Sequence, residues 1–401
     1  MIGTRFGFFF SFFGLVVCAA IPFQVGEEKI ECDCHLNYRF GETLTLTGKL
    51  PAQPMPAEAH LVFQVNERTI LYPLTLDDRG NFEFRSNFQH LPLRPFARVP
   101  YWIEGTLSNG IPFSTPREEF FYEDNRFPWK IREQPPFRVH WHRGGLQFAQ
   151  MALDVAREAH YVITAWFPVQ VNEPIEIYLY ESPGELRQAL QISKSGWIAA
   201  HADPALGVIL VSVSEGFDQR LQMEQQIPHE MMHLYLYRYR PDAYSNLPVW
   251  LREGLATAVE LYPNPDYYAL LDTAARDRSF LALSSLCETF PQEPLTAYLA
   301  YAQSAAVVQY LIEQYGIERV RQLINAYADQ YDCEAGFGHI YNFSLRQLED
   351  QWREHRFGSH PTGRALARLV PWGMLLMLVL FGPLLLSFQL LSHSTTGKES
   401  R

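Results

Sequence analysis

The segment His229-Glu230-Met231-Met232-His233 places two histidines four residues apart, with a glutamate directly after the first. On a helix, residues at this spacing lie one turn apart on the same face, so both imidazoles can reach a single metal ion. Glu230 can contact a water held by that metal without binding the metal itself. A metal that lowers the pKa of water, next to a carboxylate that takes the proton, is what a water-activating hydrolase needs.

A second segment supplies the third ligand that a catalytic zinc site usually has. Glu253 follows His233 by twenty residues, inside Leu247-Pro248-Val249-Trp250-Leu251-Arg252-Glu253-Gly254-Leu255-Ala256. Pro248 suits the first turn of a helix, and the loop at residues 237–247 lets this helix fold back against the first. A buried carboxylate is costly without a partner, and a metal ion is such a partner.

Together these residues resemble the gluzincin peptidases, the thermolysin-like clan that is also called peptidase MA. Members pair a His-Glu-x-x-His helix with a second helix whose glutamate stands in a Trp-Leu-x-Glu-Gly-x-Ala-like context, here residues 250–256. The resemblance covers roughly residues 137–357. It implies peptide-bond hydrolysis, one zinc ion per chain, Glu230 as the general base, and the ligands His229, His233 and Glu253.

Tyr301-Ala302-Gln303-Ser304 is similar to the helix start where related aminopeptidases carry a tyrosine near the scissile carbonyl. The resemblance implies that Tyr301 is an oxyanion donor, since a phenol can stabilise the tetrahedral oxygen. Ordinary packing is the alternative, because Tyr301 also belongs to an apolar helical stripe. Tyr298 and Tyr310 are rival candidates.

Two features depart from the aminopeptidase pattern. The Gly-x-Met-Glu-Asn segment that binds a free amine is missing from residues 196–214, which favours an endopeptidase. The strand expected at residues 207–211 is instead predicted to be an edge strand on which an extended peptide pairs. Pro228 precedes His229, so the helix is expected either to start there or to bend beside the metal.

The chain divides into two expected domains. Alternating strands with turns between them predict an all-β immunoglobulin-like sandwich over residues 28–124, a spacer or binding module. Residues 125–357 are expected to form an α+β thermolysin-like zincin domain. It opens on a linker at 125–136, then a strand at 137–142 and a helix at 146–167. Strands at 175–180 and 207–212 flank a helix at 183–192, and helices follow from 218.

Both ends carry targeting patterns. Residues 1–20 predict a secretory signal peptide, and the uncharged run 369–391 is long enough for one transmembrane helix. A juxtamembrane linker (358–368) and a cytoplasmic tail (392–401) complete this topology. It predicts a single-pass cell-membrane protein whose catalytic domain is extracytoplasmic, a location that permits a Cys287–Cys333 disulfide.

Composition limits the partners. The formal charge of -11 argues against nucleic acid, whose phosphates require clustered Lys and Arg. The expected partners are a peptide or protein substrate and the membrane. The sequence therefore predicts a membrane-anchored zinc metallopeptidase that uses zinc-activated water. A non-catalytic receptor or adhesin on a relic zincin fold is the alternative, and a hydrolase of non-peptide amides also stays open.

Overall fold

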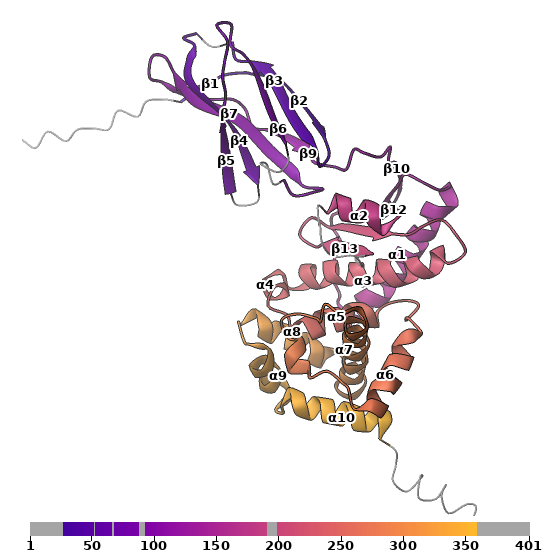
Figure 1. The fold of residues 1–401 in the computed structure, drawn as a ribbon. Helices are drawn as coiled ribbons and strands as arrows, with labels where there is room; N and C mark the ends of the chain where they lie inside the picture. The colour runs from indigo at the N-terminus through magenta and orange to yellow at the C-terminus, as the bar shows by residue number, and fades with distance from the viewer. Residues whose placement is uncertain (1–26, 52, 66–67, 88–92, 191–198, 359–401) are drawn as a thin grey trace, which may run out of the picture. The chain divides into compact units, whose positions relative to one another are not determined.

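The structure is a computed structural model, and it describes residues 27–51, 53–65, 68–87, 93–190 and 199–358. The chain divides into two compact units, Met1–Phe127 and Pro128–Arg401 (Figure 1). The predicted signal peptide and transmembrane helix lie outside the described residues. Within the described ranges, none of the helices combines the length and apolarity needed to cross a bilayer.

The first unit is a β-rich fold of two sheets. Its larger sheet has the order β1-β8-β7-β4-β5 with β9 paired to β7, and its smaller sheet has the order β2-β3-β6. The bounds are β1 Glu28–Lys29, β2 Asp33–Arg39, β3 Thr43–Lys49, β4 Pro56–Val65, β5 Arg68–Pro73, β6 Asn81–Asn87, β7 Arg98–Leu107, β8 Pro112–Ser114 and β9 Glu118–Phe121.

Alternation along the strands explains how the two sheets meet. Leu44 and Leu46 of β3 are fully buried while the threonines that alternate with them are not, as expected for side chains that point to alternate faces. The ring of Phe63 on β4 lies 6.3 Å from that of Phe84 on β6. The sheets therefore pack through apolar side chains of their facing surfaces. A disulfide joins Cys32 to Cys34 at the start of β2.

The second unit opens with a mixed sheet of order β10-β11-β12-β14-β13. The strands are β10 Lys130–Gln134, β11 Phe137–Trp141, β12 Ile175–Tyr180, β13 Ala200–Asp203 and β14 Val208–Ser212. The three inner strands are parallel, and the two outer strands run antiparallel to their neighbours. All five residues of β14 are buried, as is typical of a strand covered on both faces.

Helices form the rest of this unit, with α1 and α3 packed on each other and on the sheet (Figure 1). Four alanines of α1 recur at helical spacing and are buried (Ala149, Ala152, Ala156 and Ala159), which gives the smooth face that this close packing needs. The bounds are α1 Leu146–Trp166, α2 Pro183–Ala189, α3 Gln219–Tyr239, α4 Pro241–Tyr244, α5 Val249–Ala258, α6 Asp266–Asp277, η1 Leu283–Leu286, α7 Pro294–Tyr315, α8 Ile317–Ala328, α9 Cys333–Tyr341 and α10 Leu345–Phe357.

Helices α5 and α7 cross at Gly254. A Cβ atom on this glycine would lie 2.7 Å from the Ser304 carbonyl oxygen and 2.8 Å from Val308 Cγ2. The absence of a side chain therefore lets the two backbones approach each other. This close contact fixes the position of the neighbouring residue, Glu253, along α5 relative to α7.

Pro228 lies inside α3, so the helix does not start there. Proline has no N–H, which leaves the carbonyl of Glu224, four residues earlier, without its helical donor. The Leu261 N–H donates to that carbonyl at 3.0 Å. The segment after α5 thus completes the hydrogen bonding of α3 next to His229.

Three further expectations need correction. The strand at residues 207–211 is not an edge strand, because β14 lies between β12 and β13, and β13 forms that edge. Residues 125–136 are not purely a linker, since β10 pairs antiparallel with β11. Tyr301 is not at a helix start, because α7 begins at Pro294.

We expect the substitution Gly254→Ala to destabilise the protein by about 1–3 kcal/mol, because the new methyl group meets backbone atoms that cannot turn away. Gly338→Ala is the matched control. It also lies in a helix, but a Cβ there has no neighbour within 4 Å, so it should stabilise by about 0.5–1 kcal/mol. Urea unfolding of both variants measures the difference, and equal effects would rule out the crossing as the cause.

Candidate metal centre

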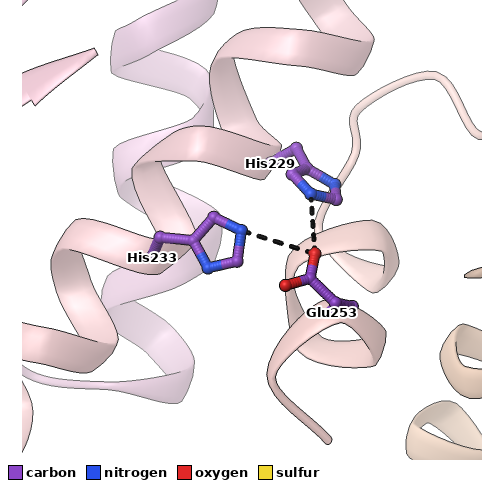
Figure 2. A group of neighbouring side chains, drawn as sticks. All are labelled: His229, His233 and Glu253. Carbon is purple, nitrogen blue, oxygen red and sulfur yellow. Dashed lines mark ion pairs between the residues drawn. The ribbon is translucent and has the colours of Figure 1, made fainter. Parts of the chain in front are cut away.

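The structure brings His229, His233 and Glu253 together, two from α3 and one from α5 (Figure 2). Glu253 Oε2 lies 3.5 Å from His229 Nε2 and 3.6 Å from His233 Nε2. One candidate ligand atom from each residue lies within 4.8 Å of the others. The three side chains converge on one point, as the sequence predicted for metal ligands.

These separations suit a tetrahedral metal ion. Bonds of about 2.0–2.2 Å from zinc to nitrogen and oxygen, at tetrahedral angles, put ligand atoms about 3.4 Å apart. Two imidazoles and one carboxylate are also a donor set that zinc prefers in hydrolases. The residues present therefore fit zinc by chemistry and by spacing.

The charges of the three groups are coupled. Burial alone lowers the pKa of His229, but hydrogen bonds to the carboxylates of Glu253 and Glu260 raise it well above its usual value. Burial works in the opposite direction on Glu253, whose pKa is nevertheless held well below normal by His233 and His229. The histidines and the carboxylate therefore stabilise each other's charged forms.

Glu230 lies on α3 between the two histidines and is only 7% exposed. It is close enough to raise the pKa of His229 electrostatically. Its side chain therefore lies near His229, and it is not one of the three that converge.

Glu260 is a residue that the sequence analysis missed. Its Oε1 atom lies 3.3 Å from His229 Nδ1, and its side chain is 7% exposed. A carboxylate on the far nitrogen of a ligating histidine fixes which ring nitrogen faces the metal. Glu260 lies two residues beyond the end of α5, so helical spacing from Glu253 does not predict this contact.

The hydrogen bond across Pro228 explains how Glu260 is held. Leu261, its neighbour, donates to the Glu224 carbonyl of α3. The backbone of this segment is thereby fixed to the helix that carries His229. The carbonyl that Pro228 leaves free therefore helps to position the carboxylate of Glu260 beside His229.

Of the three tyrosine candidates, Tyr301 lies at the site. Its ring is 6.1 Å from that of His229, and Phe290 packs edge-on against it at 4.9 Å. Burial raises the pKa of its phenol, so the hydroxyl keeps its proton. Tyr298 is 47% exposed one turn earlier, and Tyr310 packs against His355 of α10.

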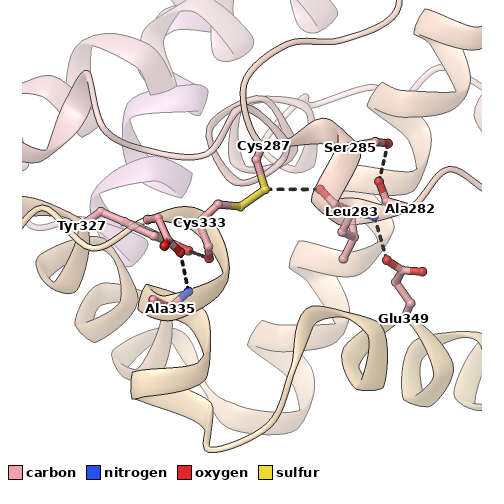
Figure 3. Close-up of a disulfide and its surroundings, with 9 residues drawn as sticks. Ala282, Leu283, Ser285, Cys287, Tyr327, Cys333, Ala335 and Glu349 are labelled. Atoms are coloured by element: carbon pink, nitrogen blue, oxygen red, sulfur yellow. Dashed lines mark hydrogen bonds between the residues drawn. A yellow bond between two sulfur atoms is a disulfide. The ribbon is translucent and has the colours of Figure 1, made fainter.

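A disulfide supports the helix that carries Glu253 (Figure 3). It joins Cys333 at the start of α9 to Cys287, in the segment that precedes α7. The Cys287 carbonyl accepts a hydrogen bond of 2.8 Å from the Val249 N–H, the first residue of α5. The start of α5 is therefore tied to a covalently fixed point.

We expect Glu260→Gln to weaken zinc binding by about 10- to 100-fold, because the amide is a poorer partner for the histidine nitrogen. Competition with a chelating indicator measures the dissociation constant. Glu224→Gln is the matched control, since its side chain pairs with Arg220 and its backbone carbonyl is unchanged. Equal zinc affinity in the Glu260 variant and the wild type would contradict this role.

A family model described as the peptidase MA superfamily matches residues 155–357. A search of curated proteins finds no match. Among solved structures, one described as a bromine derivative of BhCBM56 is 13% identical and has a TM-score of 0.18, covering 23% of this chain and 91% of that one. Cwp6 from Clostridium difficile is 10% identical with a TM-score of 0.17, covering 60% of this chain and 48% of that one. Likenesses this weak carry no argument.

The family match carries more weight. It contains α3 and α5 entirely, and with them all three converging side chains and Glu230. The matched range spans half of the chain. This protein therefore belongs to the peptidase MA superfamily.

Proposed function

We propose that this protein is a membrane-anchored, extracytoplasmic zinc metallopeptidase of the thermolysin-like type, and an endopeptidase rather than an aminopeptidase. The observation that carries the proposal is the convergence of His229, His233 and Glu253 with Glu230 beside them. A peptidase domain of the MA superfamily is the setting in which this arrangement is expected to act.

His229, His233 and Glu253 would hold the zinc ion. When bound, zinc acts as a Lewis acid that polarises the substrate carbonyl and makes water more acidic. Glu230 accepts the proton from the attacking water and then donates it to the leaving amine. Its burial keeps competing bulk water away from this transfer.

Tyr301 is proposed as the oxyanion donor. Its hydroxyl is protonated, because burial raises its pKa, and its ring lies on the His229 side of the site. A donor aimed at the carbonyl oxygen stabilises the charge that develops there as water adds.

The substrate is proposed to bind as an extended strand along β13. This strand is the edge of its sheet, and one side of it pairs with β14. Asp203 at its end is close enough to influence the pKa of Tyr244, whose ring packs 6.4 Å from that of His233. Strand β13 also contacts α3, which supports a place for the substrate near the candidate ligands, and backbone pairing along this edge would accept the middle of a peptide chain.

The location and the first unit complete the proposal. The patterns at residues 1–20 and 369–391 support export and one membrane anchor. The Cys287–Cys333 disulfide supports the extracytoplasmic side, because disulfides persist in oxidising compartments. Two packed sheets support an immunoglobulin-like class for the first unit, as a spacer or binding module.

We expect Glu230→Gln to keep zinc bound but to lower turnover by about 10²- to 10⁴-fold, since the amide cannot accept the proton. Digestion of a peptide library, read by mass spectrometry with and without a chelator, measures cleavage and its position. Internal cuts abolished by the chelator are the expected wild-type result. Zinc binding without any cleavage would instead indicate a non-catalytic receptor, and undiminished activity of the variant would exclude Glu230 as the base.

We expect Tyr301→Phe to lower kcat by about 10²- to 10³-fold with a much smaller change in KM, because the lost hydroxyl acts on the charge of the transition state. Tyr298→Phe is the control on the same helix, and it should leave kcat unchanged since that side chain is half exposed. If the Tyr298 variant shows the loss instead, the assignment of the donor is wrong.

A further inference from the structure

Arg252, the residue before Glu253 on α5, contacts the carboxylate that faces the two histidines. Its Nε–H donates to Glu253 Oε1 at 3.3 Å. The other oxygen, Oε2, is the one that lies 3.5 and 3.6 Å from the histidine nitrogens. The two oxygens of one carboxylate therefore have different partners.

This contact requires the arginine to fold back, because neighbouring residues on a helix do not face each other. Tyr244 of α4 holds it in that position. The guanidinium carbon of Arg252 lies 5.6 Å from the centroid of the Tyr244 ring, a cation–π distance. The same ring packs edge-on against His233 and against Tyr237, so α3 fixes the tyrosine.

The side chain of Arg252 is 25% exposed and that of Glu253 is 13% exposed. The guanidinium and the carboxylate carry opposite charges, so at 3.3 Å they attract each other and Oε1 is partly engaged. A free carboxylate can bind a metal through one oxygen or through both. With Oε1 engaged by the guanidinium, the one-oxygen mode is favoured, and one coordination position is left open.

We propose that Arg252 is a positioning residue that holds Glu253 as a one-oxygen metal ligand, with Tyr244 as its support. This inference rests on the proposed function, because it requires a metal at His229, His233 and Glu253. Arg252 acts only through Glu253 and needs no contact with substrate.

The test uses the full-length protein loaded with Co²⁺, whose visible absorption is intense in four-coordinate sites and weaker in five-coordinate ones. We expect Arg252→Met to bind one Co²⁺ per chain with an absorption lowered at least twofold, and kcat to fall by about 10- to 100-fold. Arg252→Gln is the second variant, in case the methionine prevents folding. Tyr244→Leu should shift the absorption in the same direction, whereas Tyr244→Phe keeps the ring and should not.

Arg319→Met is the matched control. It removes another arginine stacked on a tyrosine, Tyr341 at 5.9 Å, in the helices α8 and α9. It should change neither absorption nor kcat. Folded Arg252 variants with wild-type absorption and kcat would overturn the inference while the wild type still binds metal and cleaves peptides. A wild type that binds no Co²⁺ or Zn²⁺ would overturn the proposed function itself.

Discussion

The hydrogen bond from the Leu261 N–H to the Glu224 carbonyl connects the two segments on which the candidate site depends. The proline directly before His229, a candidate metal ligand, would otherwise leave a gap in the hydrogen bonding of α3. The donor comes from the chain just after α5, so the free carbonyl of α3 binds that segment. This hydrogen bond fixes the segment that carries Glu260 against the helix that carries the histidines.

Around that attachment, each side chain of the site is held by another element. Glu260 orients His229 from the far side of its ring, and Arg252 engages the second oxygen of Glu253. The α5–α7 crossing at Gly254 brings Tyr301 alongside. The precision of a metal site comes from such outer contacts as much as from the ligands. Three buried carboxylates can lie this close together because histidines and an arginine face them.

The sequence predicted the features that depend on local spacing. The helix at residues 146–167, the strand at 137–142, and the convergence of His229, His233 and Glu253 all follow from periodicity or from separation along two helices. The order of strands could not be obtained this way, because pairing partners are set by contacts far apart in sequence. The uninterrupted apolar run Val208-Ile209-Leu210-Val211 does favour a central strand, so the prediction of an edge strand there was wrong. Glu260 escaped for a similar reason, since it lies beyond the end of α5 and reaches His229 only once Leu261 is attached to α3.

The Cys287–Cys333 disulfide also closes a covalent ring in the chain, 46 residues in sequence separation, that contains all of α7 and α8. A cut at any peptide bond inside this ring leaves the two fragments joined, so the helix that bears Tyr301 cannot dissociate from the helices that bear the ligands. A chain cleaved at the exposed turn between α7 and α8 would run as a single band on a non-reducing gel. It would separate into two fragments only after the disulfide is reduced. The ring therefore allows the chain to be nicked between these two cysteines and remain in one piece.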